Sequence, residues 1–246
     1  MPHHFVEAPS RAPLSFTLGL LPKHFLSYAS STEGHFMIIK YGIVCYLDVY
    51  GYSAEANSAN ATEAAKRLFE MWKGVGAYIL NMGKIDFTAL SDSIFLGFDA
   101  NGDTPSLIFE SKVTPTIQHV IGQAAKYGYL LRGSAAYGQY YIFDNIVGGD
   151  AVIRAHKNEA ITKIPIFLVP RAEITKINKE SDSQVPFCCH EFQTRNGGLM
   201  QAVLIMPNPL DDCINLIGHK LDAAFEEGNF DIAAPLKSAL RAYGYE

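Results

Sequence analysis

Apolar positions along the chain follow two different periods. Residues 36–50 are rich in β-branched and aromatic side chains and become almost continuously apolar, which predicts one or two strands, the second buried on both faces. From about residue 55 to 81, apolar positions recur every three or four residues between charged ones, which predicts a helix. Further strands are predicted at 85–90, 93–98, 130–138, 164–169 and 200–206, and further helices at 106–127, 150–160, 211–227 and 232–243.

The order of these elements predicts an α+β fold, an α/β sandwich with helices on one face of a sheet. Pro115 falls inside the second predicted helix and is expected to kink it or to mark its true start. Residues 172–198 are polar and turn-rich and predict a connection. Residues 1–35 are expected to form an arm and lead-in, and residues 173–246 a C-terminal extension packed on the domain of residues 36–172.

Composition narrows the classes of function. Hydrophobic residues make up 48% and charged residues 18% of the 246, which favours a packed core over disorder. The formal net charge of −5 argues against a nucleic-acid partner. No run reaches the ~20 apolar residues of a membrane helix, and the N-terminus lacks a secretory pattern, so a cytoplasmic protein without a membrane partner is expected. The adjacent residues 188–190 lack zinc-ligand spacing.

Two aspartates stand at the ends of apolar runs. Asp48 closes the run of residues 36–50, and Asp92 lies between the short runs at 85–90 and 93–98. If the two strands pair, their carboxylates form an oxygen-rich site of the kind that binds two hard divalent cations and serves phosphoryl chemistry. The alternative is a pair of unrelated capping aspartates in turns.

The residues around both aspartates resemble a known family. The sequence at 47–53 is LDVYGYS, and at 90–93 it is LSDS; LRGSAAYG follows at 131–138, GGDAVIRA at 148–155 and a strand-like run at 164–170. These five blocks, in this order, resemble the catalytic domain of class III nucleotidyl cyclases. The resemblance implies the ferredoxin-like fold of that family over residues 36–172.

The resemblance also implies roles for individual residues. Asp48, Asp92 and the backbone carbonyl of Val49 would bind two Mg²⁺ or Mn²⁺ ions. The amides of residues 50–53, with Gly51 allowing close approach, would bind phosphate. Tyr50 would face the nucleotide and stack on a small base, or else pack on the core. The nucleotide-binding residues expected from the resemblance are Tyr50, Gly51, Tyr52, Ser53, Thr88 and Asn145.

The chain departs from the purine cyclases at several positions. Thr88 stands where adenylyl cyclases carry a lysine, and Asn145 where they carry an aspartate. Their transition-state asparagine and arginine fall near Val152 and His156, so Arg132 and Arg154 are candidates for the missing positive charge. The sequence is most similar to the pyrimidine cyclases of bacterial Pycsar antiphage systems. This resemblance implies a homodimer that cyclises UTP or CTP, with UTP expected first.

Other functions stay open at this point. A catalytically silent cyclase-like domain that binds nucleotide or a partner would fit the missing asparagine and arginine, although it would not need both aspartates. A purine cyclase also remains an alternative. The Gly148-Gly149-Asp150 triplet resembles a diguanylate cyclase signature, but the sequence continues as a predicted helix. A polymerase or nuclease palm is disfavoured by the acidic charge.

Overall fold

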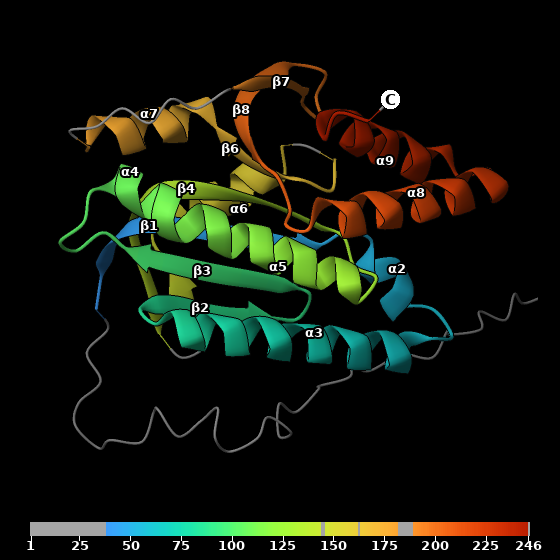
Figure 1. Ribbon diagram of the computed structural model, residues 1–246, viewed down its shortest axis with the longest axis horizontal. Coiled ribbons are helices and arrows are strands. Elements are labelled where there is room, and N and C mark those ends of the chain that lie inside the picture. The colour runs from blue at the N-terminus through green and yellow to red at the C-terminus, as the bar shows by residue number, and fades with distance from the viewer. Residues whose placement is uncertain (1–37, 144–145, 162, 182–188, 246) are drawn as a thin grey trace, which may run out of the picture. The chain divides into compact units, whose positions relative to one another are not determined.

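The computed structural model describes residues 38–143, 146–161, 163–181 and 189–245. Their strands form one mixed sheet in the order β2-β3-β1-β4-β6-β8-β7, with β5 paired to β4 (Figure 1). The pairs are antiparallel except for β4 and β6. The strands are β1 Lys40–Val49, β2 Ile85–Leu90, β3 Ser93–Asp99, β4 Leu131–Phe143, β5 Ile146–Gly148, β6 Phe167–Pro170, β7 His190–Gln193 and β8 Leu199–Ile205.

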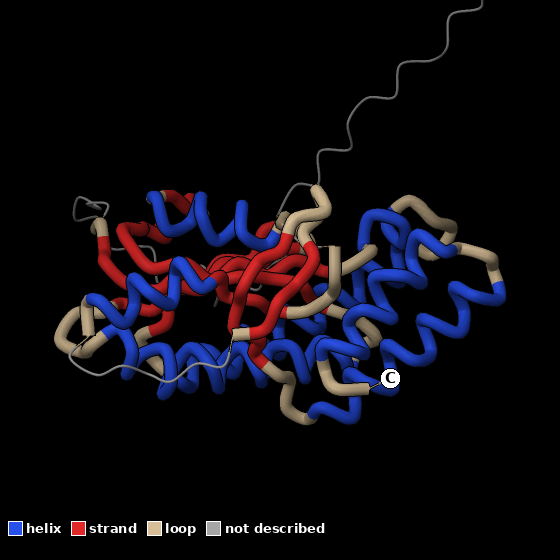
Figure 2. The backbone as a smooth tube through the Cα atoms, turned by 90° about the horizontal axis from the view of Figure 1, so that it is seen from above, coloured by secondary structure: helices blue, strands red, loops and turns tan. Residues whose placement is uncertain are grey.

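Helices lie on both sides of the sheet, which is the central layer in Figure 2. Helices α3 (Ala61–Met82) and α5 (Thr114–Lys126) cover one face of the sheet, and α6 (Asp150–Glu159) packs on the other face over β1 and β4. The predicted α+β class is confirmed, but the helices are not confined to one face.

Strand β1 shows why its sequence is almost continuously apolar. Its odd-numbered residues from Ile43 to Val49 join the core beneath α3 and α5, while Val44 and Tyr46 join a second cluster beneath α6. Successive side chains of a strand point to opposite faces, so a strand covered on both sides needs apolar residues at nearly every position. The prediction of a strand buried on both faces is confirmed.

Two predicted helices are divided in the structure. The first becomes α2 (Tyr52–Ala56) and α3, separated by a turn in which Asn57 Nδ2 donates to the Ser53 carbonyl at 2.7 Å. The second becomes α4 (Pro105–Ile108), a π-helical turn η1 (Phe109–Val113) and α5. Pro115 lies in the first turn of α5, so it marks the start of that helix as expected, but α4, η1 and α5 follow one another without a break. The proline, which cannot donate a backbone hydrogen bond, directly follows the π-helical turn.

The C-terminal residues continue the same sheet. Strands β8 and β7 extend it beyond β6, and α8 (Leu210–Glu226) and α9 (Phe230–Ala242) pack on each other beside it (Figure 1). The expectation of a plain connection over 172–198 is wrong, because α7 (Arg171–Lys179) and β7 lie there. Both are short: α7 buries only Glu173, Ile174 and Ile177, which is too little apolar pattern to predict a helix.

Candidate active site

Antiparallel pairing of β1 and β3 brings Asp48 and Asp92 together. Asp48 is paired with Ser93, and the Val49 N–H donates to the Asp92 carbonyl at 3.0 Å. Asp92 belongs to the tight turn between β2 and β3, which is anchored by a hydrogen bond of 3.1 Å from Trp72 Nε1 to the Ser91 carbonyl. The two aspartates predicted from strand ends are therefore neighbours across the β1–β3 pair, at one end of the sheet.

Asp48 is held by two neighbours on the adjacent strands. Its Oδ1 accepts a hydrogen bond of 3.0 Å from Ser93 Oγ, which also lies 2.9 Å from Tyr46 Oη. Its Oδ2 accepts from Arg132 Nε at 3.1 Å and from Nη2 at 2.9 Å. The Asp48 side chain is only 14% exposed. The ion pair with the Arg132 guanidinium therefore compensates much of the cost of removing the Asp48 charge from water.

A third carboxylate, Glu159, lies at the same end of the sheet. Its Oε1 is 2.6 Å from Arg132 Nε, and its side chain is 4% exposed. Burial raises the pKa of Glu159, which Arg132 partly offsets and Asp48 raises further. Burial also raises the pKa of Tyr46; Ser93 opposes this through a hydrogen bond, while the charges of Asp48, Glu159 and Asp92 add to it. The charges of three acids therefore act on Tyr46.

Glu159 is not among the site residues predicted from the sequence. The signal for it lies in helix α6, where Ala151, Ala155 and Glu159 occur at four-residue steps on the buried face. A glutamate on an apolar stripe has to find a positive partner inside the protein. That partner is Arg132, which reaches it from β4.

The predicted phosphate loop has a mixed outcome. Gly51 has a φ of 80°, which glycine adopts without strain, and it caps α2. Helix α2 is only five residues long, Tyr52 packs beside Tyr129 with ring centroids 6.3 Å apart, and Ser53 is exposed. Tyr50 is half-buried against the cluster of apolar residues beneath α8 and α9. This is the core-packing alternative for Tyr50.

The two expected base-reading positions differ in what the structure describes. Thr88 lies in β2 opposite Phe95 and is 4% exposed, and Asn145 lies outside the described residues. Two residues before Thr88, Asp86 accepts hydrogen bonds from Lys40 Nζ at 2.7 Å and from Tyr140 Oη at 3.0 Å. The carboxylate nearest Thr88 along this strand face is therefore already engaged.

Arg154 does not lie with the other candidates within one chain. Arg132 is paired with Asp48, whereas Arg154 contacts Tyr137, five residues further along β4 and therefore roughly 17 Å away. Arg154 Nε donates to Glu173 Oε1 at 2.9 Å, and its terminal nitrogens donate to Asp150 and to the Tyr137 carbonyl. Of the two arginine candidates, the structure therefore brings only Arg132 to Asp48 within one chain.

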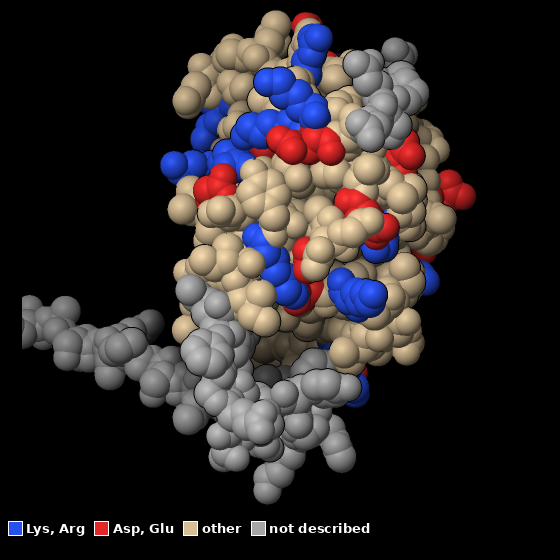
Figure 3. Space-filling model, turned by 90° about the vertical axis from the view of Figure 1, so that its left-hand side faces the viewer, with Lys and Arg blue, Asp and Glu red and all other residues tan. Residues whose placement is uncertain are grey.

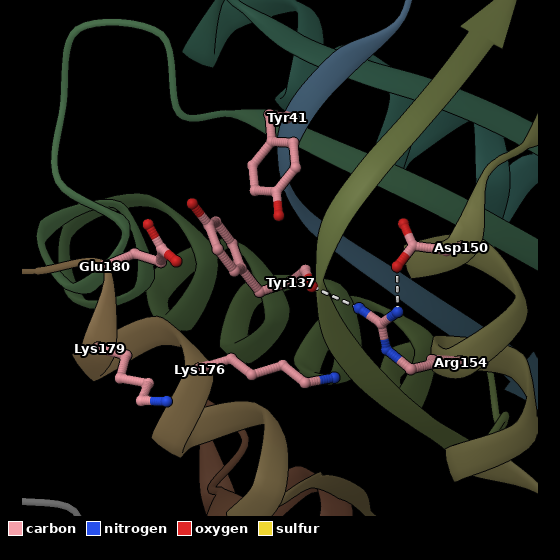
Figure 4. A pocket seen from close by; sticks show the side chains of 7 residues that line it. All are labelled: Tyr41, Tyr137, Asp150, Arg154, Lys176, Lys179 and Glu180. Carbon is pink, nitrogen blue, oxygen red and sulfur yellow. Dashed lines mark hydrogen bonds and ion pairs between the residues drawn. The ribbon is translucent and has the colours of Figure 1, made fainter.

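The surroundings of Arg154 form a pocket of about 300 Å³ (Figure 4). It is lined by Tyr41, Tyr137, Asp150, Arg154, Lys176, Lys179 and Glu180. Figure 4 shows the Arg154 guanidinium directed at Asp150 and at the Tyr137 backbone rather than into open space. Figure 3, which shows the side of the molecule at the left of Figure 1, has basic and acidic side chains interleaved among the described residues.

The donor set at Asp48 and Asp92 can be tested against a divalent cation. Within the described ranges, no three His, Cys, Asp or Glu side chains converge as a metal cage. Mg²⁺ usually takes one or two carboxylates from the protein and completes its shell with water and substrate phosphate. Two adjacent aspartates fit that pattern, and Arg132 is the group that a cation would have to displace from Asp48.

Comparison with solved structures identifies the fold. The chain is similar to the adenylyl cyclase CyaB from P. aeruginosa, with a TM-score of 0.51 and 13% identity over 70% of this chain and 96% of that one. The catalytic core of a rhodopsin-guanylyl cyclase with converted specificity, in complex with ATPαS, gives a TM-score of 0.50 and 13% identity over 70% and 99% of the two chains. A bacterial light-regulated adenylyl cyclase gives 0.51 and 12% over 69% and 52%.

These matches confirm the predicted cyclase-type fold. No family model and no curated protein sequence matches the chain. None of the helices among the described residues has the length and apolar character needed to span a membrane.

Proposed function

We propose that this chain is a metal-dependent nucleotidyl cyclase that converts a pyrimidine nucleoside triphosphate to its 3′,5′-cyclic nucleotide and diphosphate. The observation that carries the proposal is the meeting of Asp48 and Asp92 at neighbouring strand ends, on the fold shared by adenylyl and guanylyl cyclase domains. Two adjacent carboxylates on that fold support phosphoryl transfer better than they support two separate turn caps.

The reaction requires one bond to form and one to break. The ribose 3′-oxygen attacks the α-phosphorus, the bond from that phosphorus to the bridging oxygen breaks, diphosphate leaves, and the 3′-hydroxyl proton passes to solvent. Divalent cations held by Asp48, Asp92 and the Val49 carbonyl would lower the pKa of the 3′-hydroxyl and offset charge on the triphosphate.

Arg132 supplies the positive charge that the protein itself brings to the triphosphate. Burial by itself would lower the pKa of Arg132, but Glu159 and Asp48 raise it overall, so the guanidinium stays charged. Its hydrogen bond to Asp48 supports a role beside the polyphosphate. Arginine suits this task because its planar group donates several hydrogen bonds to phosphate oxygens.

The preference for a pyrimidine rests on neutral residues at the positions where adenylyl cyclases read a purine. Thr88 carries no charge, and Asp86, its acidic neighbour on the same face, is bound by Lys40 and Tyr140. A site without a free carboxylate at the base suits uracil, which presents carbonyl acceptors, better than the exocyclic amine of cytosine. We therefore place UTP before CTP.

The assembly and biological role follow from the same resemblance. We propose a homodimer with twofold symmetry, in which each chain completes the site of the other. The product would act as a second messenger, in antiphage defence if the likeness to the Pycsar enzymes extends to biology.

The test is incubation of the purified chain with equimolar UTP, CTP, ATP and GTP in Mn²⁺, with products identified by mass spectrometry. Cyclic UMP as the main product supports the proposal in full. Cyclic CMP changes the order of the pyrimidines, and cyclic AMP or cyclic GMP overturns the pyrimidine preference while retaining the cyclase. No cyclic product from any of the four overturns the activity.

A domain that binds nucleotide without turnover is the second candidate. Arg132 occupies Oδ2 of Asp48 through two hydrogen bonds, as a permanent internal counter-ion would. In that case nucleotide would bind with the same affinity in excess chelator as in Mn²⁺, and no diphosphate would be released.

A further inference from the structure

Glu159 is a buried carboxylate whose hydrogen bonding is incomplete. It ends helix α6 on the stripe that packs against the sheet, and its Oε1 has no hydrogen-bond partner among the residues that the structure describes. That atom nevertheless lies 2.6 Å from Arg132 Nε. The N–H of Nε is directed at Asp48 Oδ2 instead, at 3.1 Å. A buried charge that is close to its partner but not bonded to it is costly, so this arrangement calls for a reason.

Arg132 lies between two acids but donates hydrogen bonds to only one of them. Asp48 accepts from Nε and Nη2, which uses two of the five N–H donors of the guanidinium. Asp48 is also the carboxylate that the proposed function assigns to the cation. When a cation takes the lone pairs of Asp48, Arg132 loses the acceptor that now orients it.

We propose that Glu159 is a positioning residue that holds Arg132 at the site when Asp48 binds a cation. This inference rests on the proposed function. Glu159 Oε1 is already 2.6 Å from Arg132 Nε. A small rotation of the guanidinium therefore redirects the Nε–H hydrogen bond from Asp48 to Glu159. The two terminal nitrogens are then free to donate hydrogen bonds to the triphosphate. Glu159 thus fixes one edge of Arg132 and leaves the other edge for substrate.

The competing explanation is that Glu159 merely ties α6 to the sheet. The chain offers a matched control, because Glu173 on α7 is equally buried and pairs with Arg154. Glu173 Oε2 also accepts the Tyr137 backbone N–H at 3.1 Å, so its hydrogen bonds serve the packing of α7. A structural role predicts similar consequences for Glu159→Gln and Glu173→Gln, whereas a positioning role predicts different ones.

The experiment measures binding of inorganic tripolyphosphate in Mn²⁺ by isothermal titration calorimetry. This probe has no base and undergoes no cyclisation, so the result does not depend on the pyrimidine preference or on turnover. Glu159→Gln is expected to weaken binding about tenfold, the loss of one charge-assisted hydrogen bond, and Arg132→Gln at least as much. The double variant is expected to bind as weakly as Arg132→Gln alone, because Glu159 acts only through that arginine. Glu173→Gln is expected to bind like the native chain.

Several results would overturn the proposal. The first is a double variant whose loss of tripolyphosphate affinity is the product of the two single losses. The second is a loss of affinity in Glu173→Gln equal to that in Glu159→Gln, and the third is native affinity in Glu159→Gln. Failure of the native chain to bind tripolyphosphate would overturn it even if the chain makes a cyclic nucleotide. Glu159→Asp, which keeps the charge, should recover part of the affinity lost in Glu159→Gln, and circular dichroism melts verify that each variant is folded. If the native chain makes no product but these couplings hold, the activity fails and the positioning role stands.

Discussion

Two arginine clusters lie along strand β4, one at its first residues and one at its middle, and they differ in how completely their hydrogen bonds are satisfied. At one end Arg132 lies between Asp48 and Glu159, and Glu159 Oε1 lacks a hydrogen bond among the described residues. At the middle of the strand, Arg154 of α6 donates to Glu173, Asp150 and the Tyr137 carbonyl. A saturated arginine has little to offer a ligand, whereas an arginine shared between two acids can exchange one of them for substrate.

The pKa shifts separate the two clusters in the same way. Burial raises the pKa of Glu159 in spite of Arg132. Burial would also raise the pKa of Asp150, but the hydrogen bond and charge of Arg154 lower it overall. The cluster at Asp150 therefore gains from ionisation of its acid, as a structural ion pair does, and the cluster at Glu159 does not. This contrast can be broken or sharpened by experiment.

Substitution of the carboxylates should give the largest difference in activity between the Arg132 cluster and the Arg154 cluster. Asp48→Ala and Asp92→Ala are each expected to lower the rate of cyclic nucleotide formation by about 10³-fold or more, because the cations they hold carry most of the phosphoryl-transfer chemistry. Asp150→Ala should stay close to the native rate. Initial rates in Mn²⁺ measure this. Near-native turnover in Asp48→Ala would show that Asp48 does not hold the catalytic cation.

Substitution of Arg132 should lower mainly the activity, and substitution of Arg154 should lower mainly the stability. Arg132→Gln is expected to lower kcat/KM about 100-fold through the lost charge at the phosphates. Arg154→Gln should retain most of the activity but lower the free energy of unfolding by about 1–3 kcal/mol, since buried Glu173 then keeps only Lys176, at 3.2 Å, as a cationic partner. Kinetics and urea unfolding measure the two effects. A large rate loss in a stable Arg154→Gln protein would show that this arginine reaches a site in another chain.

Binding of a divalent cation should stabilise the protein through Asp48 and not through Asp150. At 100 times its Kd, Mn²⁺ is expected to add about 2.7 kcal/mol to the free energy of unfolding, which corresponds to ~5–10 °C in Tm for a chain of this size. The shift should disappear in Asp48→Asn and persist in Asp150→Asn, and excess chelator should abolish activity. An equal shift in all three proteins would place the cation elsewhere.

The smallest expected effect is the opposite pH dependence of the two acids in the cation-free protein. The raised pKa of Glu159 means that its contribution to stability is present below the ordinary glutamate pKa and is lost as pH rises through the folded-state pKa. The lowered pKa of Asp150 means that its contribution is present above the ordinary aspartate pKa and is lost as pH falls through the folded-state pKa.

Two matched variants test these signs. Relative to the native chain, Glu159→Gln should lose less stability as pH rises above the ordinary glutamate pKa, and Asp150→Asn should lose less as pH falls below the ordinary aspartate pKa. Each change should amount to a few degrees of Tm at most, measured by melts across the pH range. The same slope in Glu159→Gln as in the native chain would contradict the contribution of this carboxylate.

Local pattern alone determined most of the elements and the two metal candidates. The buried strand β1, strands β2 and β3, and the helices at the C-terminus follow from periodicity, and Asp48 and Asp92 stood out as charges at the ends of apolar runs. Short α7 and the turn that separates α2 from α3 were missed, because a few residues carry too little periodic signal.

Only the tertiary structure decided which charges meet. The pairing of β1 with β3 and β4 places Asp48 beside Ser93 and Arg132, and the packing of α6 brings Glu159 to the same arginine. Arg154 is instead bonded at the middle of β4 and to α7. Periodicity reports which face of an element is buried, since burial acts on each residue where it stands. Electrostatic pairing depends on distances between residues from different elements, and these are set only when the strands are in register and the helix is docked.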